Sequence, residues 1–191
     1  YLINAIKEED MTILGKVALE QVETGANIIN VNIGINTENE SRIMKKAISK
    51  IQRDIHAPLS IDTVNYHAME EGLKVYEGKA LLNSTTAKED ALHKVIDLAK
   101  KYGAAIVGLT LDEKGIPEKA EERLKVAEKI VIAATNKGIR KEDIFIDTLV
   151  LTAGAQQHLA LECIKAIKLV KKELGVKTLL GIDNISHGLP N

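Results

Sequence analysis

Short apolar runs alternate along the chain with longer segments in which apolar residues recur every three to four positions. The short runs are rich in β-branched residues and nearly continuous in apolar character, which is typical of strands buried on both faces of a parallel sheet. The pattern therefore predicts six parallel strands, at 27–33, 58–62, 79–83, 104–110, 144–147 and 177–182.

The longer segments predict amphipathic helices, because their apolar residues fall on one helical face. A capping-box pattern from Thr37 to Glu40 predicts one helix start. Pro117 suits the first position of a later helix. Glycines that suit helix ends follow four of the five segments. The predicted helices lie within 11–25, 37–51, 92–103, 117–138 and 160–175.

Strict alternation of strand and helix leaves two architectures, an open doubly wound sheet and a closed (β/α)8 barrel. A dinucleotide-binding doubly wound sheet would carry the motif Gly-x-Gly-x-x-Gly after its first strand. This chain has a single glycine there, Gly34. One β/α unit recurs about every 30 residues, which suits a barrel of roughly 250 residues. We therefore predict one barrel domain over 1–191 that holds about six of eight units, with one strand expected before Tyr1 and another after Asn191.

Polar residues stand at the end of every predicted strand. In a barrel these ends form one mouth, and the chemistry lies there. Carboxylates only accept hydrogen bonds, whereas carboxamides donate and accept, so this set suits a neutral heterocycle with a guanidine-like edge, such as a pterin. Each residue alone could equally be a turn or helix-cap residue. The strand-end residues are Asn32, Asp62, Asn83, Thr110, Asp147 and Asp183, and four of them have a polar companion, namely Thr63, Ser84, Asp112 and Asn184.

Composition and charge exclude several classes of protein. The 191 residues carry a net charge of −1, which argues against a basic face for nucleic acid or an anionic membrane. The sequence has no apolar run of membrane-spanning length and no leader pattern. A lone Cys163 excludes an internal disulfide and favours a cytoplasmic protein. The five histidines lack metal-site spacing, so no metal is expected on this chain.

Five stretches carry a resemblance to a known family. In chain order these are Gly25 to Gly34, Pro58 to Thr63, Leu82 to Ser84, the strand ending at Asp147, and Leu180 to Pro190. They resemble the methyltetrahydrofolate:corrinoid protein methyltransferases, whose pterin-binding barrel is shared with dihydropteroate synthase and with the folate domain of cobalamin-dependent methionine synthase. No single stretch is decisive, but the ordered set is specific.

The resemblance implies a role for each matching residue. Asp62, Asn83 and Asp147 match the family residues that hold the pterin ring, and Asn32 and Gly181 lie in the matching stretches and are expected at the same site. Asn184 matches the asparagine that contacts N5 of the folate and is the expected catalytic residue. The implied reaction moves a methyl group between N5 of methyltetrahydrofolate and the cobalt of cobalamin carried by a corrinoid protein. A homodimer is also expected from the family.

Two departures from the family leave alternatives open. The family usually has serine where Asp183 stands and an acid where Asn30 stands. A carboxylate beside N5 either stabilises a protonated amine or weakens methyl transfer. A dihydropteroate synthase would carry a Ser-Arg-Lys type sequence after the seventh strand, where this chain has Asp183, Asn184 and Ile185. The alternatives are a dihydropteroate synthase-like enzyme and a non-catalytic folate-binding fragment, and the direction of methyl transfer stays open.

Overall fold

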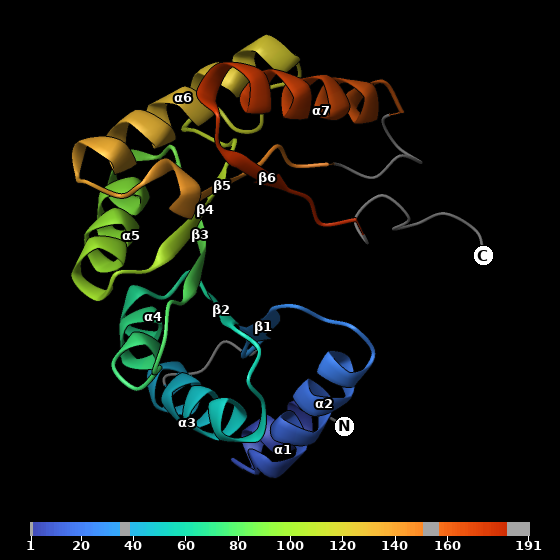
Figure 1. The fold of residues 1–191 in the computed structure, drawn as a ribbon, viewed down its shortest axis with the longest axis vertical. Helices are drawn as coiled ribbons and strands as arrows, with labels where there is room; N and C mark the ends of the chain where they lie inside the picture. The colour runs from blue at the N-terminus through green and yellow to red at the C-terminus, as the bar shows by residue number, and fades with distance from the viewer. Residues whose placement is uncertain (1, 35–38, 151–156, 183–191) are drawn as a thin grey trace. The chain divides into compact units, whose positions relative to one another are not determined.

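The computed structural model describes residues 2–34, 39–150 and 157–182, in which two N-terminal helices are followed by alternating strands and helices (Figure 1). The strands are β1 (Ile29–Asn32), β2 (Leu59–Asp62), β3 (Leu81–Thr86), β4 (Ala105–Leu109), β5 (Ile144–Asp147) and β6 (Lys177–Leu179). The α-helices are α1 (Leu2–Lys7), α2 (Thr12–Glu23), α3 (Glu40–Asp54), α4 (Tyr66–Leu73), α5 (Glu89–Tyr102), α6 (Ala120–Asn136) and α7 (Gln157–Leu169). A 3-10 turn η1 (Lys141–Asp143) precedes β5, and a π-helical turn η2 (Val170–Leu174) extends α7.

The six strands belong to one sheet in the order β1-β2-β3-β4-β5-β6. β1 pairs with β2, β2 with β3, β4 with β5, and β5 with β6, all in parallel. Parallel neighbours need a crossover between them, and helices supply it here. The predicted α/β fold with six parallel strands is therefore confirmed.

The chain packs as two compact units. The first unit holds Tyr1–Asn83 with Lys101–Ala104, and the second holds Ser84–Lys100 with Ala105–Asn191. β3 and α5 contribute residues to both units. The prediction of a single domain over 1–191 stays a prediction.

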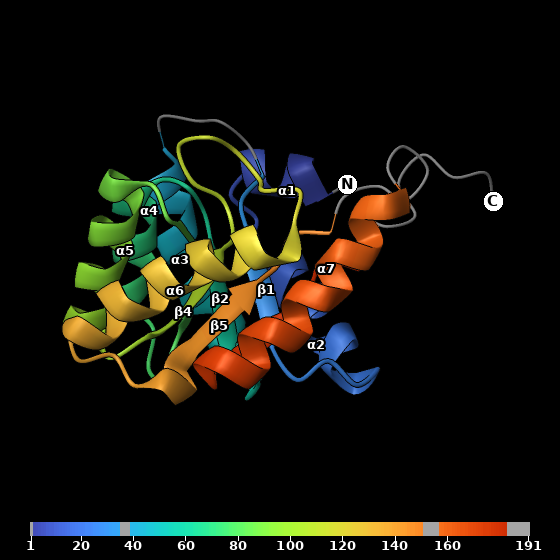
Figure 2. The same cartoon turned by 90° about the horizontal axis from the view of Figure 1, so that it is seen from above.

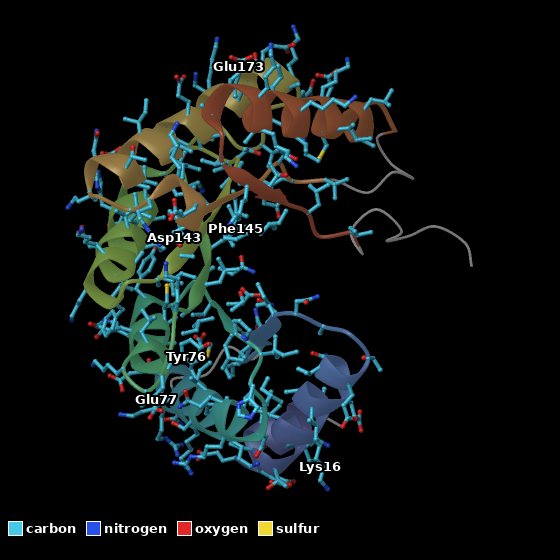
Figure 3. All side chains as sticks on the ribbon, in the orientation of Figure 1. Lys16, Tyr76, Glu77, Asp143, Phe145 and Glu173 are labelled. Atoms are coloured by element: carbon cyan, nitrogen blue, oxygen red, sulfur yellow. The ribbon has the colours of Figure 1, made fainter. Side chains whose placement is uncertain are left out.

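In the first unit, helices α2, α3 and α4 cover one face of β1 and β2 (Figure 1). The apolar strand residues Val31, Leu59 and Ile61 are buried on this side. Gly72 of α4 allows close packing, because a Cβ there would lie 3.2 Å from Ile61 Cδ1 and 3.3 Å from Met44 Cγ. Tyr76, labelled in Figure 3, accepts the backbone N–H of Leu59 at 3.1 Å through its hydroxyl and so fixes the start of β2.

In the second unit, α6 packs on β4 and β5 and lies beside α7 (Figure 2). Ile106, Ile130, Ile144 and Ile146 are fully buried between these elements. Gly108 lets α6 approach β4, because a Cβ there would lie only 2.8 Å from Ile130 Cγ2. The core of this unit is therefore packed without spare volume at this crossing.

Several predicted boundaries were wrong; the last strand, for example, ends at Leu179 and not at Ile182. Asn83 does not end its strand, because β3 continues to Thr86. Pro117 is not the first residue of a helix, since α6 begins at Ala120. α3 begins at Glu40, and the Glu40 carboxylate accepts hydrogen bonds from Thr63 and Asn65 instead of capping its own helix. Thr37 lies outside the described residues.

Two helices, α1 and α4, were missed from the pattern. α4 has eight residues, and two of its four buried positions are Ala68 and Gly72, so its apolar stripe is weak in sequence. Its start depends on Asn65, whose side chain accepts the N–H groups of His67 and Ala68 at 3.1 and 3.2 Å. This is a normal N-cap, and it offsets the short length of the helix.

Candidate functional site

Three of the predicted pterin residues lie in one row across the first unit. The strand register places Asn32 beside Asp62 and Asp62 beside Asn83. Residues at equal register in parallel strands project from the same face of a sheet. The backbone N–H of Thr63 donates to the carbonyl of Asn83 at 3.0 Å, which keeps the strands aligned just where β2 ends. We call Asn32, Asp62 and Asn83 the polar row.

Asn30 connects two members of the polar row. It stands two residues before Asn32 on β1, so its side chain projects from the same face. Its Nδ2 donates to Asp62 Oδ2 at 2.8 Å, and Asn83 Nδ2 donates to Asn30 Oδ1 at 3.4 Å. An ionised carboxylate only accepts, so Asp62 fixes which end of the Asn30 amide faces it. Asn30 therefore orients both neighbours.

The loop after β2 is held by hydrogen bonds to Glu40, the first residue of α3. Thr63 is buried, and its hydroxyl donates to the Glu40 carboxylate while accepting the N–H of Asn65 at 3.0 Å. Asn65 Nδ2 also donates to Glu40, at 3.1 Å. These bonds fix the segment that leaves Asp62. Val64 between them is 92% exposed and offers an apolar contact beside the polar row.

In the second unit, Asp147 ends β5 and is partly buried. Its Oδ1 accepts the N–H of Leu149 at 2.7 Å, and no described residue donates a hydrogen bond to Oδ2. Burial raises the pKa of Asp147 above its ordinary value, and the hydrogen bond from Leu149 opposes that shift. One carboxylate oxygen is therefore fixed while the other is available as an acceptor.

The turn after Asp147 is held by two helices. Arg123 of α6 donates through Nη1 to the carbonyls of Thr148 at 2.7 Å and Leu149 at 3.1 Å. The Thr148 hydroxyl lies 3.1 Å from Cys163 Sγ of α7. Cys163 is fully buried, as its position on the apolar stripe predicts.

The remaining strand-end candidates have separate outcomes. Gly181 lies two residues after the end of β6 and is half-buried. Thr110 is buried, and its hydroxyl has no partner among the described residues. Asp112 forms a turn with Gly115 and accepts the N–H of Lys114 at 2.8 Å, which is the structural role its sequence indicates. Asp183 and Asn184 lie outside the described residues.

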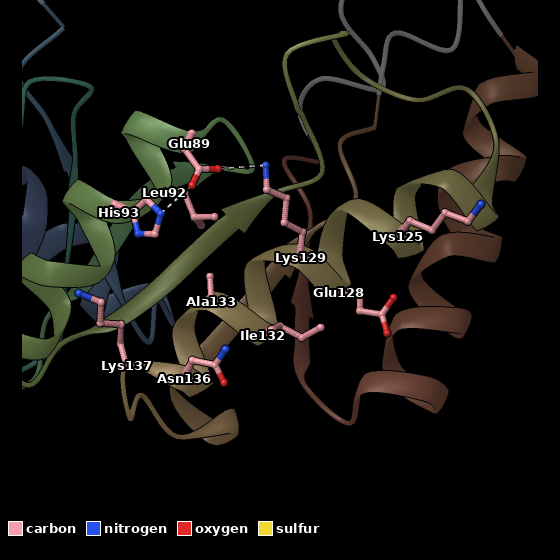
Figure 4. A pocket seen from close by; sticks show the side chains of 10 residues that line it. All are labelled: Glu89, Leu92, His93, Lys125, Glu128, Lys129, Ile132, Ala133, Asn136 and Lys137. Atoms are coloured by element: carbon pink, nitrogen blue, oxygen red, sulfur yellow. Dashed lines mark hydrogen bonds and ion pairs between the residues drawn. The ribbon is translucent and has the colours of Figure 1, made fainter.

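Of two cavities, one borders the polar row and the other does not. One of about 320 Å³ lies between α1, α2 and β1 and is bordered by Asn30, Asn32 and Gly34 with apolar residues of the helices. The other, a groove of about 620 Å³ on the second unit, is lined by α5, α6 and Lys137 (Figure 4). There Glu89 pairs with His93 at 2.9 Å and Lys129 at 3.5 Å. No strand-end residue lines this groove.

Within residues 2–34, 39–150 and 157–182, no three His, Cys, Asp or Glu side chains gather as a metal site would require. In the same ranges no helix is long and apolar enough to cross a membrane.

Sequence reasoning missed the part played by Asn30 and Arg123. Asn30 was noted only as a departure from the family. Its signal was its alternation with Asn32, which puts both amides on one face of β1. Arg123 falls within an amphipathic helix, where a basic residue is solvated by default. Nothing local in the sequence indicates that its side chain is 0% exposed.

The fold and the polar row define a class: an α/β barrel-type domain with acid and amide side chains at or near the ends of its strands. Comparison with family models then identifies the family. The model of the pterin binding enzymes matches residues 4–190, so the chain belongs to the pterin-binding enzyme family.

Individual relatives agree with this family. The methionine synthases of Mycobacterium leprae and Mycobacterium tuberculosis are 30% and 29% identical over 184 residues. Each match covers 91% of this chain but only 15% of the relative, so the chain spans a small part of those proteins. Dihydropteroate synthase of Xanthomonas albilineans, solved with 4-aminobenzoic acid, superimposes with a TM-score of 0.70 at 21% identity, over 92% of this chain and 66% of that one. This likeness shows a barrel of the dihydropteroate synthase type over the matched part.

Proposed function

We propose that this domain binds methyltetrahydrofolate and moves a methyl group between its N5 and the cobalt of a corrinoid protein. The observation that carries the proposal is the polar row of Asn32, Asp62 and Asn83, which Asn30 connects at the ends of β1 and β2 and within β3. The similarity to methionine synthase supports methyl transfer as the reaction.

The donor set fits a pterin ring. The 2-amino group and ring N–H of a pterin donate, and the carboxylates of Asp62 and Asp147 accept. The ring carbonyl and remaining nitrogens accept, and the amide groups of Asn32 and Asn83 donate. In this proposal Val64, which is 92% exposed, gives the ring an apolar contact beside the row.

The reaction requires help at N5, because a tertiary amine is a poor leaving group unless it is protonated or strongly hydrogen-bonded in the transition state. We assign this task to Asn184, since a carboxamide can change from acceptor to donor as the charge on N5 changes. The corrinoid cobalt supplies the nucleophile or the methyl donor and is a substrate of this domain. The proposal includes a corrinoid protein as the partner of this domain and a homodimer as its oligomeric state.

Ligand-dependent unfolding tests the binding step. The thermal midpoint should rise on adding methyltetrahydrofolate, because a ligand at 100 times its Kd stabilises the folded state by about 2.7 kcal/mol. Asp62→Ala and Asn83→Ala should each reduce this rise. Asp97→Asn, which removes an exposed α5 carboxylate paired with Lys137, should not. No rise with the unaltered protein would reject the proposed function.

Methyl transfer to cob(I)alamin, followed by absorbance, tests the reaction step. Asn184→Ala should lower turnover more than affinity, whereas Asp62→Ala and Asn83→Ala should lower affinity. Condensation of a pterin diphosphate with 4-aminobenzoate, in place of methyl transfer, would support the dihydropteroate synthase-like alternative. Binding without either reaction would support the non-catalytic module.

A further inference from the structure

A fully buried arginine lies beneath the Asp147 turn. Arg123 is 0% exposed, and its Nε donates to the carbonyl of Pro117 at 2.7 Å. Its Nη2 is buried and has no hydrogen-bond partner among the described residues. Burying a guanidinium is costly, and an apolar side chain of similar size would fill the same space without that cost. Packing alone therefore does not explain an arginine here.

The guanidinium binds the backbone of a strained turn. Leu149 has φ 56°, in the left-handed region that non-glycine residues seldom adopt. Nη1 of Arg123 binds the carbonyl of Thr148, which belongs to the same peptide unit as the Leu149 N–H that donates to Asp147 Oδ1 at 2.7 Å. It also binds the carbonyl of Leu149, in the next peptide unit. The bonds from Arg123 thus support the conformation that aims the Asp147 carboxylate.

We propose that Arg123 is a positioning residue for pterin binding, which acts by holding the turn that orients Asp147. Through Leu149 it fixes Oδ1 and leaves Oδ2 as the acceptor for the ligand. This inference rests on the proposed role of Asp147 in binding the pterin. Lysine cannot replace Arg123 fully, since one ammonium cannot reproduce the fork that binds Pro117 and the turn together.

Titration of the full chain with methyltetrahydrofolate tests the role. Arg123→Met should weaken binding about tenfold, a change of about 1.4 kcal/mol, while Arg123→Lys should weaken it less. Arg140→Met, at an exposed arginine on the same unit, is the control and should bind as the unaltered protein does. If Arg123→Met fails to fold, Arg123→Lys supplies the comparison, and undiminished binding by the folded variant would overturn the inference.

Two further variants separate positioning from packing. Leu149→Gly should restore most of the affinity lost in Arg123→Met or Arg123→Lys, because glycine adopts a positive φ without strain. A packing role predicts no such rescue. Asp147→Ala combined with either Arg123 change should bind no more weakly than Asp147→Ala alone, whereas additive losses would overturn the inference.

The two proposals fail in different ways. Absence of methyltetrahydrofolate binding by the unaltered protein rejects the proposed function. Normal binding by that protein together with undiminished binding by the folded Arg123 variant rejects only the positioning role. Amide hydrogen exchange at Leu149 gives a readout without ligand: exchange should quicken at least tenfold in the Arg123 variant and not in Arg140→Met. Equal exchange in both would also overturn the inference.

Discussion

Single residues decide the electrostatics of the polar row. Asp62 is the only ionisable member of the row, and the neighbouring position 30 carries an amide where the resembling family usually has an acid. Asn30 Nδ2 lies 2.8 Å from Asp62 Oδ2, so an acid there would place two carboxylates in contact. Two carboxylates in contact would have to share a proton, whereas the Asn30 amide donates its own hydrogen to Asp62.

Asn30→Asp should therefore make pterin affinity depend on pH. Two adjacent carboxylates cannot both ionise freely, so one pKa rises and the pair keeps a proton at low pH that can stand in for the lost amide donor. We expect affinity about tenfold weaker at pH 8 than at pH 5, since one pKa unit is worth 1.36 kcal/mol. Isothermal titration at both pH values measures this. Asn27→Asp, at an exposed position just before β1, adds the same charge and should not produce the pH dependence.

Asp147 gives a second prediction at the residue scale. Burial raises its pKa, so between the ordinary and the raised value the folded state binds more protons than the unfolded state. Stability therefore falls as pH rises through that window. Asp147→Asn stays neutral and can still accept the N–H of Leu149. Its thermal midpoint relative to the unaltered protein should be higher at pH 7 than at pH 3.5, while pterin affinity falls. A midpoint difference that is the same at both pH values would contradict this.

At the scale of elements, apolar periodicity was sufficient to predict a helix where the helix is long and its buried stripe is continuous. The α3 stripe of Ile43, Ala47 and Ile51 was read correctly, and all three are buried. Boundaries were set by tertiary bonds that local pattern does not contain. Thr63 bonds to Asn83 in mid-strand, and the Pro117 carbonyl is engaged by Arg123.

The crossing of α6 over β4 is closely packed, which can be tested. Gly108→Ala would place a Cβ 2.8 Å from Ile130 Cγ2 and 3.2 Å from Ile146 Cδ1, and Ile130 is fully buried. Overpacking of this kind costs about 1–3 kcal/mol in the free energy of unfolding, measurable by urea denaturation. Gly72→Ala meets its neighbours at 3.2 Å or more and gains helix propensity, so it should cost less. A larger loss of unfolding free energy for Gly72→Ala than for Gly108→Ala would contradict close packing at the crossing of α6 and β4.

At the scale of the whole molecule, the order of strands and the family could be predicted from sequence, and the connections between site residues could not. The carboxyl ends of the strands follow from chain order in a parallel α/β fold, so Asp62 and Asp147 could be predicted as the last residues of their strands. The bond from Asn30 depends on register between strands 32 residues apart in sequence, and the burial of Arg123 depends on how α6 meets the turn after β5. Neither has a local signature.

The side-chain amide of Asn30, which bonds to both Asp62 and Asn83, also fixes the donor-to-acceptor direction of these hydrogen bonds. Asp62 can only accept, so Asn30 turns its NH₂ toward it and its oxygen toward Asn83, which must then present an NH₂ in turn. One carboxylate thereby dictates the direction of a chain of three side chains. If a ligand binds at Asp62 as proposed, two heterocycles of identical outline, one with an amino group and one with a carbonyl on the edge that meets Asp62, would differ in affinity, because the direction of the hydrogen bonds distinguishes them.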